Sequence, residues 1–543
     1  MKKIVIHNVV AALSKLEYPQ DKLIIQKTKS LIHGDYSTNI AMVLTNDLKE
    51  APDKIAKRII TKIHELFPEN YTSIDIAGPG FINFKLKRKL LFNELKNILK
   101  KNESFGKTTL GEGKKALVEF VSANPTGPLT IGHGRGAILG DTISNILEWN
   151  GYIVEREYYF NNAGKQMDRL ALSVYLRYCE LLNKKVDFPD ECYQGKYIYN
   201  IAEILIDKYK DELIEDEQNV LFKESAEEHI FKDIKNTLND LGIKFDNFFN
   251  EDSLYNNKAI FKIIDSLKNK SLIYEKDGAT WFKATSVGRN DDRVLIKSTG
   301  EPTYRLPDIA YHKDKLDRNF DLIIDVFGAD HMDAYPDVLA ALKCLDYDVD
   351  KIKVLIHQFA TITENGQSVK MSTRKANFIT LDELLSEVGP DVLRYFFLMR
   401  GMNTHLNFDI NIAKTESDEN PVFYLQYAYA RISNIINRSV QLKYIDNDQP
   451  NLSLLCTDIE IELINMLIAF PDYVEDTLNK LEPQIIVNYL QALAMLFHRF
   501  YSKNKVLTED EELSYARLML IKAIKIVFKN GLTILGISHP EKM

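Results

Sequence analysis

The stretch that decides the fold of this chain is ALVEFVSANPTGPLTIGHGRGAILGDTISNILEW, residues 116–149. It begins with an apolar run at 116–121, which predicts a buried β-strand. A loop containing Pro and Gly follows, and helical periodicity then runs from about 132 to 149. Strand, loop and helix in this order form the opening unit of an α/β fold that binds a nucleotide beyond the carboxyl end of the strand.

The start of that helix, Thr130-Ile131-Gly132-His133, carries groups that suit a phosphate. Backbone N–H groups at a helix N-terminus have no partner within the helix, and the helix dipole favours negative charge there. Gly132 lets a nucleotide approach the backbone closely, and His133 can donate to phosphate oxygens. A lone T-x-G-H tetrapeptide is more often a polar helix start with a solvent-facing histidine.

A second motif, KMSTRK, occupies residues 370–375. Its three cations can neutralise a triphosphate and stabilise a pyrophosphate leaving group during an in-line displacement. Taken alone, the run would be an ordinary basic surface loop.

The rest of the chain divides by pattern. Residues 1 to about 105 look like a separate unit that contains the alternating strand FINFKL at 81–86. A charged stretch of helical periodicity at about 185–275 is interpreted as an insertion. Further strands are expected at 293–296, 322–327 and 354–356.

From about 420 onward the whole chain is predicted to be helical. Asn420 and Pro421 form a helix start, with a capping residue before a proline at the first helical position. Asn530 and Gly531 are expected to end the final helix.

Composition restricts the class of protein. The 543 residues, 45% of them hydrophobic, are enough for three to four domains. The four cysteines form neither a zinc-type pair nor a disulfide framework, which fits a reducing, cytoplasmic setting. Neither a secretory leader nor a membrane span is expected. The net charge of −8 excludes a generic polyanion binder, so any RNA contact must rely on local basic patches.

The two motifs together resemble the paired signature of class I aminoacyl-tRNA synthetases. Longer segments in the same order are similar to the arginyl-tRNA synthetase family in particular, and they cover nearly the whole chain outside the insertion. These segments are 34–41, 76–83, 118–129, 303–311, 328–331, 370–395, 420–428 and 531–543.

The resemblance implies an α/β chain with three parts. An α+β unit at 1–105 would bind the outer corner of tRNA. A Rossmann-like (HUP-type) parallel-sheet catalytic domain would span 106–415 and include the helical insertion. An all-helical domain at 416–543 would bind the anticodon arm. The expected partners are L-arginine and tRNA(Arg), the expected cofactors are ATP and the Mg²⁺ that accompanies it, with no resident metal site, and a monomer is the default expectation.

The resemblance also assigns site residues. Catalytic roles fall to residues of the two motifs: Thr130, Gly132, His133, Lys370, Ser372 and Arg374. ATP contacts are expected from the neighbouring positions Ala123, Pro125, Thr126, Gly127, Pro128, Leu129, Ile131 and Met371. The chain departs from the family at Thr130, where histidine is usual, and at Thr373, where a second lysine is usual. Either Arg374 or Lys375 would supply the charge missing at Thr373.

Arginine is a planar cation with five N–H donors, so its pocket needs a carboxylate. Tyr304 and Asp308 are four residues apart and would share one helix face, and they match the family's arginine contacts. Asp330, after a predicted strand, is a second candidate, and we favour Asp308. Asn124 resembles the residue that holds the substrate's amino-acid backbone.

Candidate tRNA contacts lie in the C-terminal part of the chain. Residues 490–543 hold eight Lys/Arg against five Asp/Glu, a local excess of positive charge. Lys522, Lys525 and Lys529 fall near one helix face, although such a stripe is more often simply solvated. Tyr427 and Arg431 belong to a tyrosine-rich helix whose exposed rings could stack on unpaired bases.

Three rival interpretations remain open. A class I synthetase for another amino acid would need a different pocket: zinc ligands for cysteine, or cations in place of Tyr304 and Asp308 for glutamate. A non-catalytic RNA-binding paralogue is favoured by Thr130 and Thr373. A small-molecule nucleotidyltransferase would have no use for the flanking domains.

Overall fold

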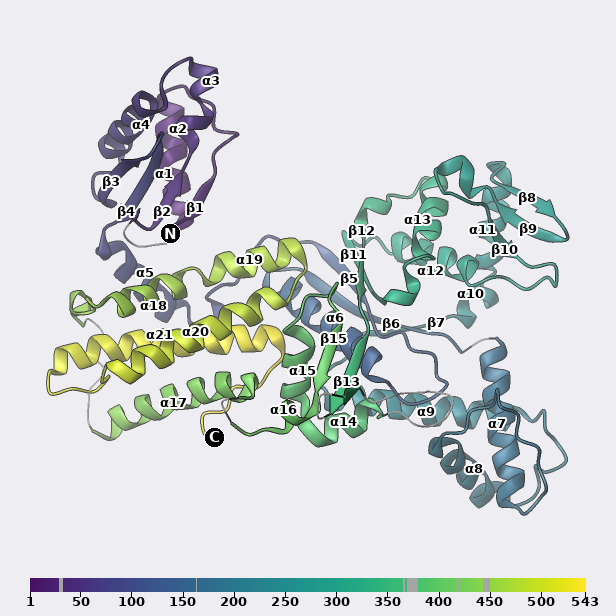
Figure 1. Ribbon diagram of the computed structural model, residues 1–543. Coiled ribbons are helices and arrows are strands. Elements are labelled where there is room, and N and C mark those ends of the chain that lie inside the picture. The colour runs from purple at the N-terminus through teal and green to yellow at the C-terminus, as the bar shows by residue number, and fades with distance from the viewer. Residues whose placement is uncertain (29–32, 163, 365–366, 369–378, 418, 443–449) are drawn as a thin grey trace.

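The structure is a computed structural model that describes residues 1–543 except 29–32, 163, 365–366, 369–378, 418 and 443–449 (Figure 1). Figure 1 shows an N-terminal unit, a central sheet with lobes beside it, and a C-terminal helical bundle. The fold class expected from the sequence is therefore confirmed.

The N-terminal unit is an antiparallel sheet of order β1-β2-β4-β3 covered by helices. Its own core ends at Leu86, whereas the buried side chains of α5 (Arg88–Lys101) belong to the main core and pack with the C-terminal helices. Its elements are α1 (Lys2–Lys15), β1 (Ile25–Lys27), β2 (Tyr36–Thr38), α2 (Ile40–Val43), α3 (Thr45–Leu48), α4 (Pro52–Leu66), β3 (Tyr71–Ala77) and β4 (Phe81–Leu86).

The central sheet is parallel throughout, with strand order β12-β11-β5-β6-β7. The chain leaves β5 through α6 to reach β6 on one side, whereas β11 and β12 lie on the other side, so the order reverses beside β5. Ligands bind at such a switch point. The elements are β5 (Lys115–Glu119), α6 (Ile131–Trp149), β6 (Ile153–Phe160), β7 (Asn247–Asn250), β11 (Leu322–Gly328) and β12 (Ile352–His357).

The predicted first strand ends two residues early, because Val121 and Ser122 have φ angles of 67° and 42°. These left-handed conformations are uncommon for residues with a side chain and turn the chain out of the sheet. Helix α6 then returns beneath it with almost every residue after its first turn buried. The N-terminus of α6 is thereby fixed at the carboxyl edge of the sheet.

Two lobes are inserted around the sheet. Between β6 and β7 lie α7 (Lys165–Leu181), α8 (Lys196–Tyr209) and α9 (Val220–Asp240). The lobe before and after β11 has a core of its own. It contains α10 (Asp252–Asn256), α11 (Ala259–Asn269), β8 (Ile273–Lys276), β9 (Ala279–Phe282), η3 (Ala284–Val287), β10 (Arg293–Ile296), α12 (Arg305–Asp317), η4 (Ala329–His331), α13 (Tyr335–Cys344) and η5 (Val349–Lys351).

A small sheet of order β14-β13-β15 and a helical bundle complete the chain. Asn420 caps the bundle's first helix by accepting from the Val422 N–H at 3.1 Å, which confirms the predicted start. In the described residues no helix is long and apolar enough to cross a membrane. The elements are β13 (Ala360–Glu364), β14 (Gln367–Ser368), α14 (Leu381–Val388), α15 (Pro390–Leu398), β15 (Leu406–Asp409), α16 (Ile410–Lys414), α17 (Pro421–Gln441), η7 (Leu452–Leu454), α18 (Asp458–Ile468), α19 (Phe470–Lys480), α20 (Gln484–Lys503) and α21 (Glu511–Leu535), with η2 (Asn102–Ser104) after α5.

The predicted end of the last helix at Asn530-Gly531 is wrong. Helix α21 continues to Leu535, and Gly536 supplies the left-handed cap with φ of 67°. Asn530 instead donates from its amide to the carbonyl oxygens of Asn102 and Phe105, at 3.0 and 2.9 Å. Gly531 serves close helix packing, because a Cβ there would lie 2.7 Å from a methyl carbon of Leu490.

Gly531→Ala is therefore expected to destabilise the protein. The added methyl group would overpack the contact with Leu490, and this outweighs the better helix propensity of alanine for a net loss of about 1–2 kcal/mol. Chemical denaturation measures the change, with the exposed neighbour Thr533→Ala as a matched control. A gain in stability would show that the two helices have room for a methyl group.

Candidate active site

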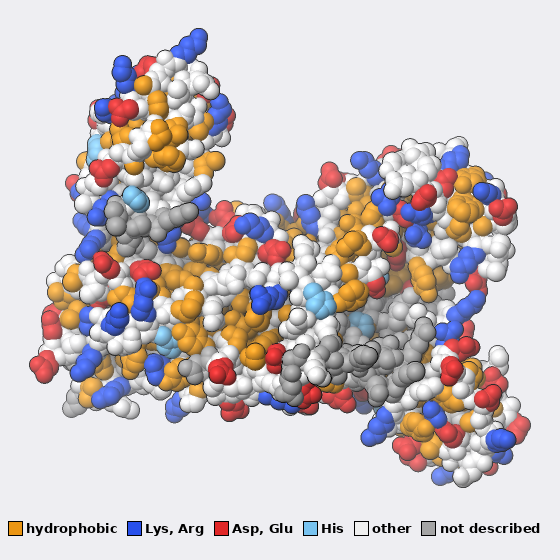
Figure 2. All heavy atoms as spheres, in the orientation of Figure 1, with side chains coloured by type: hydrophobic (Ala, Val, Ile, Leu, Met, Phe, Trp, Pro, Cys, Tyr) orange, Lys and Arg blue, Asp and Glu red, His pale blue; other side chains and the backbone are white. Residues whose placement is uncertain are grey.

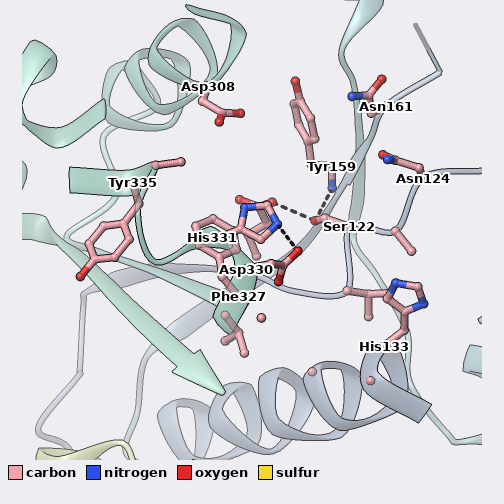
Figure 3. A pocket seen from close by; sticks show the side chains of 18 of the residues that line it. Ser122, Asn124, His133, Tyr159, Asn161, Asp308, Phe327, Asp330, His331 and Tyr335 are labelled. Carbon is pink, nitrogen blue, oxygen red and sulfur yellow. Dashed lines mark hydrogen bonds and ion pairs between the residues drawn. The ribbon is translucent and has the colours of Figure 1, made fainter. Parts of the chain in front are cut away.

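A cavity of about 720 Å³ opens at the carboxyl edge of the central sheet (Figure 3). Its walls come from the β5–α6 loop, the first turns of α6, the end of β6, the start of α12, the segment after β11 and the end of β12. This is the position expected for a ligand at the switch point of an α/β sheet. The lining includes Glu119, Asn124, Thr130, Gly132, His133, Tyr159, Tyr304, Asp308, Asp330, His331 and Tyr335.

Thr130 and His133 together cap the start of α6 through two reciprocal hydrogen bonds. The Thr130 hydroxyl oxygen accepts from the His133 backbone N–H at 3.5 Å, and the Thr130 N–H donates to His133 Nδ1 at 3.1 Å. Burial lowers the pKa of His133, so the ring is neutral near pH 7. With Nδ1 accepting, the ring proton sits on Nε2, which is the atom that can donate to a ligand in the cavity.

The basic motif at 370–375 lies outside the described residues, but the residues that flank it are placed. Thr380 forms an antiparallel bridge with Thr130, and the Leu381 N–H donates to the Leu129 carbonyl at 2.8 Å. The described chain that follows the basic motif is therefore anchored beside the start of α6 at Thr380 and Leu381.

The loop between β5 and α6 divides into lining and supporting residues. Ala123 and Asn124 line the cavity, and the Asn124 amide donates to Gln166 Oε1 of α7 at 2.9 Å. The other predicted ATP contacts on the described chain lie outside the lining. Leu129 and Ile131 are buried in the core, and the Thr126 carbonyl accepts from the Tyr197 hydroxyl at 2.7 Å.

The four predicted arginine contacts all lie around this cavity. Figure 3 shows the Asp308 carboxyl directed from α12 into the space between its walls. Burial raises the pKa of Asp308 to about 6, and among the described residues no ion pair or hydrogen bond engages this carboxyl. Asp330 differs, since its side chain is 70% exposed and lies 3.7 Å from His331 Nε2. A cationic ligand would stabilise the charged form of Asp308 more than that of the exposed Asp330, which favours Asp308 as the partner of the cation.

A buried charge cluster that sequence reasoning missed forms the floor beneath Asp308. Lys315 is fully buried and pairs with Glu119 of β5 and, at 2.6 Å, with Asp325 of β11. His312 lies 3.1 Å from Asp325, and its Nδ1 is 2.8 Å from the Asp308 carbonyl oxygen. The sequence did carry a sign of this cluster, because Glu119 and Asp325 each interrupt an otherwise apolar strand. The cluster fixes the first turns of α12 against the sheet.

Comparisons with known proteins agree with this arrangement. The family model for the class I (R) tRNA synthetase catalytic domain matches residues 94–394, the arginyl tRNA synthetase N-terminal domain matches 3–86, and the DALR anticodon-binding domain matches 425–543. An arginine–tRNA ligase of Chlorobium phaeobacteroides (strain BS1) is 47% identical over 555 residues, with all of both chains covered.

The chain belongs to the arginyl-tRNA synthetase family. Another relative, an arginine–tRNA ligase of Desulfotalea psychrophila, is 46% identical with 96% of this chain and 95% of the relative covered. The Thermus thermophilus arginyl-tRNA synthetase structure shares the fold with a TM-score of 0.78 at 21% identity, and both chains are fully covered.

Within this family member, the predicted tRNA contacts in the bundle differ in environment. Tyr427 is 45% exposed, and the Arg431 guanidinium lies 4.4 Å from its ring centre and 4.8 Å from that of Tyr501. Lys525 pairs with Glu541 at 2.7 Å, and Lys529 pairs with Glu103. Figure 2 shows acidic and basic side chains interspersed over this face of the bundle. Tyr427 and Arg431 are therefore better candidates for base contacts than Lys525 and Lys529, which already have acidic partners.

Proposed function

We propose that this protein is an arginine–tRNA ligase. It activates L-arginine with ATP and transfers the arginyl group to the 3′ end of tRNA(Arg). The observation that carries this proposal is the carboxyl of Asp308, which has no partner among the described residues and shares one cavity with the capped start of α6 in a chain of this family.

The first step is adenylate formation. ATP lies over the start of α6, where His133 Nε2–H donates to a phosphate oxygen. An oxygen of the arginine carboxylate forms a bond to the α-phosphorus as the bond to the pyrophosphate oxygen breaks. We assign neutralisation of the departing pyrophosphate to Lys370 and Arg374, with a hydrogen bond from the Ser372 hydroxyl and Met371 beside the nucleotide. The work of the protein is positioning and charge stabilisation, with no covalent enzyme intermediate.

Arginine binding is assigned to the opposite wall of the cavity. Asp308 pairs with the guanidinium, Tyr304 closes the rim with a side chain that is 74% exposed, and Asn124 holds the amino-acid backbone. In the second step a ribose hydroxyl of the tRNA attacks the carbonyl carbon of the adenylate and AMP leaves.

Several further assignments support this function without adding a step. Mg²⁺ would enter with ATP, where it would neutralise phosphate charge. Tyr427 and Arg431 are assigned to the anticodon arm, with Lys522, Lys525 and Lys529 as secondary contacts. The monomeric state, the cytoplasmic location and the boundaries near 105 and 415 stay predictions from the sequence.

ATP–pyrophosphate exchange with each of the twenty amino acids, with and without total tRNA, tests the function. Exchange with arginine alone, and only when tRNA is present, is the expected result. Exchange with another amino acid would refute the pocket assignment. No exchange alongside intact tRNA binding would indicate a non-catalytic paralogue and show that Thr130 and Thr373 are not tolerated.

The pKa of Asp308 predicts a pH dependence. A carboxyl whose pKa is raised to about 6 carries its charge above that pH and loses it below. The kcat/KM for arginine should therefore fall about tenfold per pH unit below pH 6, mainly through KM, because bound arginine stabilises the charged form. Exchange kinetics between pH 5 and 8 measure this, and Asp308→Asn should flatten the profile. An equal fall in kcat/KM for ATP would contradict it.

A further inference from the structure

Three arginines converge on one buried carboxylate beside the cavity. Asp337, on the first turn of α13, has a side chain that is 2% exposed. Its oxygens lie 2.8 Å from Arg289 Nε, 2.8 Å from Arg293 Nε and 3.0 Å from Arg305 Nε. We call these four residues the arginine cluster. They join the segment after η3, the start of β10, and the starts of α12 and α13.

The charges of the arginine cluster do not balance. One guanidinium is enough to neutralise a buried carboxylate, and three like charges held this close repel one another. Among the described residues, the other acid paired with the cluster is the largely exposed Asp291, 3.5 Å from Arg293. Each arginine reaches Asp337 through Nε, and the three side chains are 25–32% exposed. Nη1 of Arg293 faces Asp291, whereas no further acid among the described residues engages the Nη groups of Arg289 and Arg305. The cluster is thus a preorganised surface site for an anion.

The arginine cluster adjoins the cavity wall in sequence, although none of its four residues is among those that line the cavity. Tyr304 precedes Arg305, and Tyr335 and Val338 flank Asp337 on α13; all three line the cavity. In Figure 3, Tyr335 and Asp308 stand across the cavity from His133. A nucleotide whose phosphates rest on the start of α6 would have its triphosphate at the wall opposite Tyr335, which leaves the cluster open to a different anion.

We propose that the arginine cluster binds a backbone phosphate next to the 3′ terminus of transfer RNA. This inference rests on the proposed function, in which the terminal ribose must enter this cavity. A single strand that enters past the rim carries its preceding phosphates across the cluster. Guanidinium groups match phosphate oxygens in charge and in fork geometry. Contacts of this kind fix the register of an RNA without reading its sequence.

A double-mutant cycle between protein and RNA tests this proposal. Arg289→Gln removes one guanidinium and leaves Asp337 two arginine partners, so the buried charge stays neutralised. The RNA partners are tRNA(Arg) and the same tRNA without its last four nucleotides. We expect Arg289→Gln to weaken binding of full-length tRNA about tenfold, as for a lost charge-assisted hydrogen bond, and to leave the shortened tRNA unaffected. The slope of log affinity against log salt should fall by about 0.7 for the full-length tRNA.

Controls separate the possible explanations. Lys313→Gln removes a cation that pairs with Asp317 on the same helix as Arg305, and it should leave both affinities unchanged. If Arg289→Gln fails to fold, Arg289→Lys, which keeps the charge but not the fork, should show a smaller loss that is again confined to full-length tRNA. Equal weakening of both RNAs would overturn the proposal.

Two further outcomes are equally decisive. A raised KM for ATP with unchanged tRNA affinity would assign the arginine cluster to a nucleotide phosphate and overturn the proposal. A wild-type protein that neither binds tRNA(Arg) nor exchanges pyrophosphate with arginine would refute the proposed function itself, a result distinct from either failure of the cycle.

Discussion

Asp308→Asn should raise the KM for arginine by about 30-fold or more while the KM for ATP changes by less than about threefold, because removing one partner of a buried charge pair costs about 2–5 kcal/mol. The carboxyl of Asp308 has no partner among the described residues, and burial raises its pKa to about 6. It is thus placed to gain from a guanidinium. Asparagine has nearly the same shape but offers no charge. ATP–pyrophosphate exchange in the presence of tRNA, with each substrate varied in turn, gives the two KM values.

Two matched variants show whether the effect is local. Asp314→Asn removes a carboxylate from the same helix, one that pairs with Arg318 at 3.1 Å outside the cavity lining, and should leave the arginine KM within about twofold. Asp330→Asn tests the other candidate, whose exposed position predicts a smaller loss. If the KM for ATP rose as much as that for arginine, Asp308 would support the whole cavity instead of selecting the amino acid. A larger effect of Asp330→Asn would reverse our assignment.

Local patterns were enough to predict most of the fold. The strand, loop and helix at 116–149, the strand 293–296 and the helix start at Asn420 depend on periodicity, turn residues and capping, and all are present. The predicted helix end at Gly531 was wrong because a glycine in the sequence can indicate either a helix cap or close packing of two helices. Only the partner helix, through Leu490 some forty residues away, distinguishes the two. Helix α5 was likewise grouped with the N-terminal unit in sequence, although its apolar face packs with the C-terminal helices.

The candidate site likewise contains residues that local motifs predict and residues that they do not. Tyr304, Asp308 and His133 were found because a motif carries each of them, and the cavity brings them together. The floor was missed because Lys315 meets Glu119 across 196 positions of sequence, and a lysine in a helix gives no local sign of burial. The arginine cluster was missed for the same reason, since its members come from four separate elements. Long-range pairing of charges is information that periodicity does not contain.

His133→Ala should lower kcat for ATP–pyrophosphate exchange by about 10²–10³-fold with little change in the KM for arginine. His133 is neutral because burial lowers its pKa, and its Nδ1 already accepts from the Thr130 N–H. Only Nε2–H can therefore follow the charge that develops on the phosphate oxygens. A donor that acts on the transition state contributes to kcat more than to substrate affinity.

The alanine variant alone is ambiguous, because it also removes half of the cap of α6. Losing that hydrogen bond costs about 1 kcal/mol of stability and could displace the start of the helix. His133→Gln separates the two roles, since glutamine at this position can complete a capping box with Thr130 through its side-chain oxygen. The glutamine variant should regain the thermal stability lost by alanine and still lack most of the activity. If activity returned together with stability, His133 would act through the shape of the helix start, and the phosphate contact would have to be assigned to the backbone N–H groups of α6 alone.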